Sequence, residues 1–240
     1  MQREGFEVLF TEEVPWGVVA GVALPPAGQA NCWRLAQQLT VEEAQFACAC
    51  SPMRQPSWIG GRLALRAAAL RLGVALGTVL STPRGAPDLS RPLIGSIAHK
   101  TKLAVAVLGR IGPGEPTFQL GVDLEEWLPR RDVIGRMVLV GQERAYVNSL
   151  AHEHRWDAIV RVFSVKEALF KALDPFLQRY IGFQEACVNL ERPHEPLVRL
   201  QLKHNEGPFS ISVLAKSTHN HLLTVVRAAP ASNAQLSGLP

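Results

Sequence analysis

Residues 209–226 read FSISVLAKSTHNHLLTVV, and residues 95–108 read GSIAHKTKLAVAVL. In each stretch, two apolar runs are separated by a short polar turn, which is the pattern of two successive β-strands. Each strand pair follows sequence with helical periodicity, so the order of elements is similar in the two halves of the chain. This repeated order predicts an α+β fold of two related halves and favours an internal duplication.

The rest of the chain supplies more strands and the helices. Further strands are expected at residues 7–10, 18–24, 118–124, 186–190 and 198–203. Helices are expected at residues 41–50, 57–72, 142–150 and 156–173. Thr40 and Glu43 have the spacing of a capping box, and Gly73 is placed to end the second helix. The two halves are expected at residues 1–117 and 118–228, followed by a disordered tail at 229–240.

The composition is that of a globular protein. With 240 residues, 47% of them hydrophobic and 19% charged, the chain is long enough to bury a substantial core. The net charge of +4 and the pI of about 9.1 suit an anionic ligand or an acidic partner, and are too modest to imply nucleic acid. The N-terminus has no signal-peptide pattern, which predicts a cytoplasmic location. The chain has four cysteines and no C-x-x-C pair, and this count is low for a disulfide scaffold, which indicates reduced thiols at Cys32, Cys48, Cys50 and Cys187.

Two carboxylates end a predicted apolar strand. Asp123 and Glu125 lie two residues apart in QLGVDLEE, residues 119–126. Side chains alternate along a strand, so the two carboxylates point to one face. Oxygen ligands that converge in this way suit Mg²⁺. The other interpretation of the same residues is an acidic strand end in solvent.

The second group of charged residues interrupts the apolar stripe of a predicted helix. Residues 163–171 read FSVKEALFK, and Lys166 falls in the middle of the stripe. Glu167 lies at its margin, and Lys171 follows one turn later on the same side. A buried lysine is costly unless it is paired or functional. Two lysines and a carboxylate beside a buried seam suit a metal-bound phosphate site, whereas an i,i+4 pair in solvent is the structural alternative.

Basic side chains in the first half could bind phosphate. His99 ends a short apolar strand and is followed by Lys100 and Lys102. Arg62 and Arg66 lie one turn apart on a helix otherwise rich in Ala and Leu, and Arg is the preferred group for bidentate phosphate contacts. A structural histidine and an arginine face in solvent are the alternatives.

These motifs occur in this order in one family. The sequence resembles the large, pseudo-dimeric class of 4′-phosphopantetheinyl transferases, which serves siderophore, nonribosomal-peptide and polyketide synthases. The resemblance covers about residues 57–173. It is carried by Gly61-Arg62, by GSIAH at residues 95–99, by GVDLE at residues 121–125, and by FSVKEALFK at residues 163–171.

The resemblance implies a metal site and a catalytic lysine. Asp123, Glu125 and Glu167 would hold Mg²⁺ against the pyrophosphate of coenzyme A. Lys171 would contact the phosphates and assist the leaving group. The fold that it implies is two similar α+β halves related by a pseudo-two-fold, with the active site between them.

The resemblance also implies a nucleotide site and a base. His99 and Arg62 would contact the 3′-phosphate of coenzyme A, and Lys166 is expected on the cofactor side. Glu143 matches a family carboxylate that helps to deprotonate the acceptor serine, and Glu167 is the other candidate for the base. The family has Ser before the His, and Ala98 here removes a hydroxyl contact to the cofactor.

The predicted reaction is the Mg²⁺-dependent transfer of 4′-phosphopantetheine from coenzyme A to a serine of an apo carrier protein, which releases adenosine 3′,5′-bisphosphate. The predicted partners are acyl, peptidyl or aryl carrier proteins of polyketide, nonribosomal-peptide or fatty-acid synthases. We expect a monomer with no nucleic-acid or membrane partner. The alternatives are a Mg²⁺-dependent nuclease, a basic module that binds an acidic protein, and an inactive carrier-binding relative.

Overall fold

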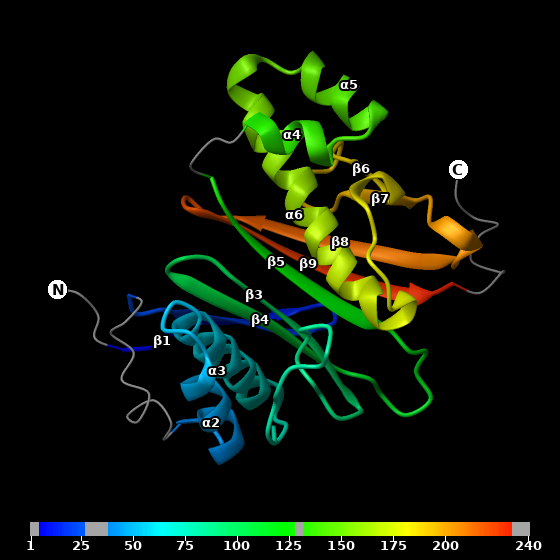
Figure 1. Cartoon of the computed structure of the whole chain (residues 1–240). Coiled ribbons are helices and arrows are strands. Elements are labelled where there is room, and N and C mark those ends of the chain that lie inside the picture. Colours follow the sequence, from blue (N-terminus) through cyan, green and yellow to red (C-terminus); the bar gives the residue numbers. More distant parts are fainter. Residues whose placement is uncertain (1–4, 27–37, 128–131, 232–240) are drawn as a thin grey trace. The chain divides into compact units, whose positions relative to one another are not determined.

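The computed structural model describes residues 5–26, 38–127 and 132–231 (Figure 1). The chain divides into two compact units, Met1–Pro113 and Gly114–Pro240, with the boundary four residues before the predicted one. Residues 232–240 of the predicted tail lie outside the described residues, as does Cys32.

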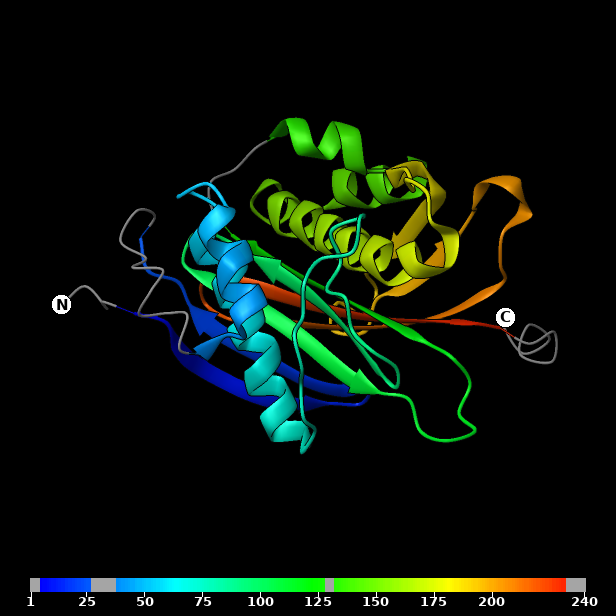
Figure 2. The ribbon, with the colours of Figure 1, turned by 60° about the horizontal axis from the view of Figure 1, so that its bottom comes forward.

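In its described residues, the first unit is a four-stranded antiparallel sheet with the helices α2 (Val41–Ala49) and α3 (Gln55–Leu72). Its strands, in spatial order, are β1 (Glu7–Val14), β2 (Gly17–Ala23), β4 (Leu103–Arg110) and β3 (Leu93–His99). Helix α2 precedes α3, which lies along β2 and β4 (Figure 2). The two central strands are almost fully buried, which explains their near-continuous apolar sequence.

The second unit is built on a three-stranded antiparallel sheet. Its strands, in spatial order, are β5 (Gln119–Glu126), β9 (His221–Pro230) and β8 (Phe209–Ser217). Helix α6 (His152–Leu177) packs on β5 and β9, and the short helices α4 (Asp132–Val138) and α5 (Gly141–Ser149) pack against α6. The other elements in the described part of this unit are a strand pair and two 3₁₀ turns: η2 (Phe183–Glu185), β6 (Ala186–Asn189), β7 (Leu197–Leu200) and η3 (Lys203–Asn205).

The predicted strands and helices are all present, and the helix caps predicted at Thr40 and Gly73 are confirmed. Thr40 Oγ1 accepts from the Glu43 backbone N–H, and the Glu43 carboxylate accepts from the Thr40 N–H. Gly73 ends α3 in the left-handed conformation that favours glycine, with φ of 70°. Several expectations need correction. The helix predicted at residues 156–173 spans His152–Leu177, the strand predicted at 7–10 spans Glu7–Val14, and the strand predicted at 198–203 spans Leu197–Leu200. β9 continues to Pro230, into the predicted tail, and α4 was not predicted because seven residues that include Gly135 show too little periodicity.

The internal duplication is present in the topology of the two units. The first contains the series β2–α3–β3–β4, and the second contains β5–α6–β8–β9. In both, the last strand in sequence lies between the other two strands. The preceding helices also correspond, because α2 and α5 each have nine residues and begin 100 positions apart. The resemblance between the two strand pairs in the sequence therefore reflects a repeated fold.

Candidate active site

Strand β5 and helix α6 touch through their backbones at Gly121. A Cβ atom at this position would lie 1.9 Å from the Ala168 carbonyl oxygen and 2.8 Å from the Ala172 nitrogen. Any side chain larger than hydrogen would therefore push the strand away from the helix. The close approach brings the side chains that follow on β5 within reach of α6.

Asp123 and Lys171 meet across this contact. The Lys171 ammonium donates to Asp123 Oδ1 at 3.1 Å and to the Val122 carbonyl oxygen at 2.8 Å. Asp123 is only 6% exposed, and its other oxygen, Oδ2, is buried without a hydrogen-bond partner. An unpartnered buried carboxylate oxygen is costly. Asp123 Oδ2 is therefore suited to bind a cation, which would give this oxygen a partner.

The other two predicted metal ligands lie on the same two elements. Glu125 is on β5, two residues after Asp123 and on the same face, and Glu167 is on α6, one turn before Lys171. Both are half-buried. Among the described residues, no three His, Cys, Asp or Glu side chains are close enough together to form a ready metal site. The donors are all carboxylates, the type that Mg²⁺ prefers, and the Mg²⁺ assignment stays a prediction.

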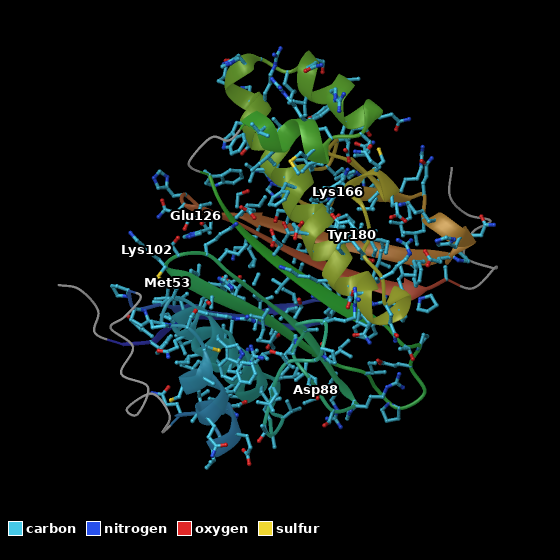
Figure 3. All side chains as sticks on the ribbon, in the orientation of Figure 1. Met53, Asp88, Lys102, Glu126, Lys166 and Tyr180 are labelled. Atoms are coloured by element: carbon cyan, nitrogen blue, oxygen red, sulfur yellow. The ribbon has the colours of Figure 1, made fainter. Side chains whose placement is uncertain are left out.

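Lys166 lies inside the second unit, as its place in the apolar stripe predicted (Figure 3). Its ammonium donates three hydrogen bonds, to Glu143 Oε2 at 2.8 Å and to the carbonyl oxygens of Val138 and Phe183 at 2.9 Å. Three donors are all that an ammonium has. Burial lowers the pKa of Lys166, and the Glu143 carboxylate opposes this effect. These contacts join α6 to the end of α4, to α5 and to η2.

Glu143 is buried as deeply as its partner. Besides the lysine bond, Oε2 accepts from the Val140 N–H at 2.7 Å, and Oε1 accepts from the Val188 N–H at 2.7 Å. The carboxylate thus caps α5 and fixes strand β6 to it. The described structure gives it three donors and 2% exposure, which is an enclosed position for a group predicted to reach an acceptor serine.

Arg62 is enclosed within the first unit. Its Nε donates to the Val79 carbonyl oxygen, and its Nη2 donates to the Leu80 carbonyl oxygen and to Ser81 Oγ. The guanidinium also stacks over the Trp58 ring at 4.0 Å. Burial lowers the pKa of Arg62 to about 10, so the group stays charged at neutral pH. The expectation of an arginine face in solvent is wrong here, and the predicted contact with the cofactor stays a prediction.

His99 is placed differently from Arg62. It is exposed at the end of β3, next to the turn that carries Lys100 and Lys102. Ala98 is buried, so its side chain points away from the exposed face of this strand end. Lys100 and Lys102 place two basic side chains beside the histidine.

Comparison with known proteins assigns both units to one family. The model of the 4′-phosphopantetheinyl transferase superfamily matches residues 119–226. The model of the 4′-phosphopantetheinyl transferase N-terminal domain matches residues 42–109. The chain belongs to the 4′-phosphopantetheinyl transferase family. The first match includes Asp123, Glu167 and Lys171, and the second includes Arg62 and His99.

Curated relatives carry the same family name. 4′-Phosphopantetheinyl transferase Svp from Streptomyces mobaraensis is 32% identical over 148 residues, which are 60% of this chain and 58% of the relative. 4′-Phosphopantetheinyl transferase PptT from Mycobacterium tuberculosis is 28% identical over 152 residues, which are 62% of this chain and 64% of the relative. The matched part of this transferase-family chain thus spans less than two thirds of each relative.

Solved structures show a more distant similarity. A holo-(acyl-carrier-protein) synthase from Bacillus anthracis in complex with coenzyme A is 16% identical, with a TM-score of 0.37. The match covers 47% of this chain and 96% of that one. No helix in the described part of the transferase-family chain is long and apolar enough to cross a bilayer.

Proposed function

We propose that this protein transfers the 4′-phosphopantetheine group of coenzyme A to a serine of an apo carrier protein and releases adenosine 3′,5′-bisphosphate. The observation that carries the proposal is the contact between Asp123 and Lys171, which lies inside the region that the superfamily model matches. Phosphoryl transfer needs a cation and an amine at the phosphates, because negative charge develops on the bridging oxygens. Asp123 supplies a ligand for the cation, and Lys171 is the amine.

Asp123, Glu125 and Glu167 are the residues that would hold Mg²⁺. The ion would neutralise the charge of the pyrophosphate and orient it. The orphaned Asp123 Oδ2 supports this assignment, since it is buried and has no donor. Lys171 is 32% exposed on its side chain, so its ammonium has a path from the carboxylate to a bound phosphate.

We assign His99, with Lys100 and Lys102 beside it, to the nucleotide phosphates of coenzyme A. The exposure of His99 and the charge of its turn support this assignment. Arg62 was predicted for the same contact, and its buried hydrogen bonds to residues 79–81 make it a weaker candidate. Lys166 and Glu143 are left out of the assignment because both are buried.

The partner that we propose is an apo carrier protein of a polyketide, nonribosomal-peptide or fatty-acid synthase. The net charge of +4 supports an acidic partner, because complementary charge steers association. The rate of transfer is then expected to fall as ionic strength rises, provided that the carrier is not saturating.

Mass spectrometry of an apo carrier protein tests the proposal. The carrier is incubated with this protein, coenzyme A and Mg²⁺, and the expected product carries one phosphopantetheine on a serine. EDTA should abolish the gain in mass. No gain across acyl, peptidyl and aryl carriers would overturn the proposal, and cleavage of DNA under the same conditions would support the nuclease alternative instead.

A further inference from the structure

Glu143, a buried glutamate of the second unit, has a counterpart in the first. Glu143 is the third residue of α5, and Glu43 is the third residue of α2. Glu43 is also fully buried: Oε2 accepts from the Thr40 N–H at 3.0 Å, and Oε1 accepts from the Val79 N–H at 2.8 Å. Both carboxylates thus cap their own helix with one oxygen and bind a distant backbone N–H with the other.

The cation that each glutamate binds is also repeated. Arg66 Nη2 on α3 lies 2.6 Å from Glu43 Oε2, and Lys166 Nζ on α6 lies 2.8 Å from Glu143 Oε2. Each cation follows its glutamate by 23 positions. Each also donates to backbone carbonyl oxygens of nearby segments, at Leu76 and Gly77 in the first unit. We call each arrangement, the Glu43–Arg66 pair and the Glu143–Lys166 pair, a carboxylate hub.

The first unit has a carboxylate hub but lacks the carboxylates predicted to bind the metal. The two sheets can be aligned at the first residue of their last strands. Leu103 pairs with Ala23 in the first sheet, and His221 pairs with Glu126 in the second, so Ala23 corresponds to Glu126. The positions that match Asp123 and Glu125 are therefore Ala20 and Val22, and both are buried and apolar.

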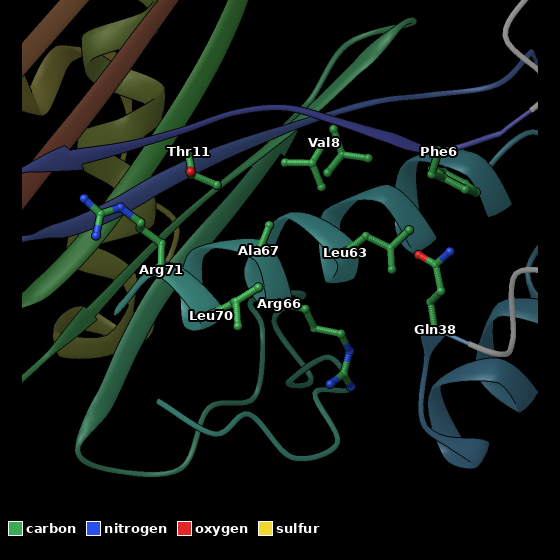
Figure 4. Close-up of a pocket in the computed structure, with 10 residues that line it drawn as sticks. Phe6, Val8, Thr11, Gln38, Leu63, Arg66, Ala67, Leu70 and Arg71 are labelled. Atoms are coloured by element: carbon green, nitrogen blue, oxygen red, sulfur yellow. The ribbon is translucent and has the colours of Figure 1, made fainter. Parts of the chain in front are cut away.

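The helix positions change in the same way. With the offset of 100 that relates the two glutamates, Ala67 matches Glu167 and Arg71 matches Lys171. Val22, Ala67 and Arg71 line a pocket of about 650 Å³ between β1, β2 and α3 (Figure 4). The predicted metal site of the second unit thus corresponds to a largely apolar pocket in the first, and yet the hub is kept.

From this comparison we infer that Glu143 and Lys166 are positioning residues and touch neither the acceptor serine nor coenzyme A. The inference rests on the proposed function. Lys166 ties α6 to the end of α4 and to η2, and Glu143 ties α5 to β6. The hub fixes α6 from the side of α4 and α5. Lys171, one turn after Glu167 on the same helix, contacts Asp123 on β5. Of the two carboxylates offered as the base, Glu167 remains.

The first test compares Glu143→Gln with its matched control, Glu43→Gln. Each variant loses one charged acceptor of the same kind, so we expect similar falls in melting temperature. At a temperature well below melting, kcat of both should stay within about tenfold of the wild type, with an unchanged pH–rate profile. A general base supplies about 10²- to 10⁴-fold. A loss of that size in Glu143→Gln alone, with one limb of the profile missing, would overturn the inference.

The second test uses Lys166→Met and the double variant Glu143→Gln/Lys166→Met. The single change leaves a buried carboxylate without its cation, whereas the double change removes both charges, so the double variant should melt higher than Lys166→Met. Its KM for coenzyme A should match that of the wild type. A rise of about tenfold or more in a folded double variant would indicate a lost phosphate contact and overturn the inference.

Failure of the proposed function can be told apart from failure of this inference. Transfer by the wild-type protein is measured first, and its absence overturns the proposed function. The melting temperatures do not depend on transfer. Similar falls in the two glutamate variants support the hubs, and a fall confined to one of them contradicts the equivalence on which the inference rests.

Discussion

The ammonium of Lys171 on α6 lies beside the carboxylate of Asp123 on β5, with 3.1 Å between Nζ and Oδ1. It occupies one side of a carboxylate whose other oxygen has no partner. The lysine is therefore the cation of the site in this structure. We expect it to turn toward a phosphate when a divalent ion binds Asp123, because two cations beside one carboxylate repel each other.

Replacing Asp123 should lower the reaction rate strongly and change the stability of the fold little. Asp123→Asn keeps the size of the side chain and removes its charge, so we expect kcat to fall by at least about 100-fold. Lys171 is partly exposed, and the loss of its pair should change the free energy of unfolding by no more than about 1 kcal/mol. Turnover against Mg²⁺ concentration and a thermal melt measure the two effects. Full activity in this variant would remove Asp123 from the metal site.

Replacing Lys171 should lower the reaction rate without weakening the binding of Mg²⁺. Lys171→Met removes the amine that competes with a cation at Asp123, so less Mg²⁺ should be needed for half-maximal activity. The maximal rate should fall by about tenfold or more, because the leaving group loses its positive partner. Isothermal titration of Mg²⁺ with the coenzyme A complex provides the comparison. A rate equal to the wild type would exclude Lys171 from the reaction.

Gly121 should tolerate no side chain. In Gly121→Ala the new methyl group would overlap the Ala168 carbonyl oxygen, and we expect a loss of about 3 kcal/mol in the free energy of unfolding. Gly141→Ala is the matched control, because a Cβ there meets nothing within 4 Å. That change should be neutral or stabilising by about 0.5 kcal/mol. Equal effects in denaturant titrations would contradict the close contact between β5 and α6.

The ion cluster around Arg179 should make stability depend on acid pH. The Arg179 guanidinium binds Glu185 and Glu206, and this lowers the pKa of Glu185 to about 2 from an ordinary value of 4.5. A carboxylate with a depressed pKa stabilises the fold above its unfolded pKa and loses that contribution as pH falls through the folded pKa. Glu185→Gln should therefore lower the melting temperature most at neutral pH and progressively less from pH 4.5 toward 2.

The control for this prediction is Glu195→Gln, since Glu195 is exposed. Its melting temperature should follow that of the wild type across the same pH range. A constant difference between Glu185→Gln and the wild type from pH 7 to 2.5 would contradict the role of the ion pair.

Arg62 should prove necessary for folding stability. Lysine cannot reproduce the fork that binds two carbonyl oxygens and Ser81, so Arg62→Lys should cost on the order of 2 kcal/mol. We expect KM for coenzyme A to change little in the folded variant. A large rise in KM with unchanged stability would instead support the predicted contact with the 3′-phosphate.

The sequence predicts the elements of this fold well, because their signals are local. The apolar runs of β2 and β4, the capping box of Thr40 and Glu43, and the left-handed Gly73 each depend on a few neighbouring residues. Helix α4 escapes prediction because seven residues that include a glycine are held by packing on α6 and not by their own propensity.

The site is harder to predict, because burial depends on partners far away in the sequence. The position of Lys166 in an apolar stripe correctly predicts a buried amine. It does not show that the carbonyl oxygens of Val138 and Phe183 satisfy it. For Arg62, the partners lie 17 to 19 positions away in a loop with no regular pattern. The Gly121 contact was within reach of the sequence, since glycine in a buried strand indicates close approach of another backbone.

The placement of the last strand in the middle of each sheet bears on how the chain folds as it is synthesised. Strand β5 has to wait for β9, and His221 emerges 95 residues after Glu126. At about 5–20 residues per second, β5 stays unpaired for roughly 5 to 20 s. During that time its edge is open to pairing with other chains. A chain that stopped before residue 221 would never close this sheet, so the second unit depends on the strand at residues 221–230.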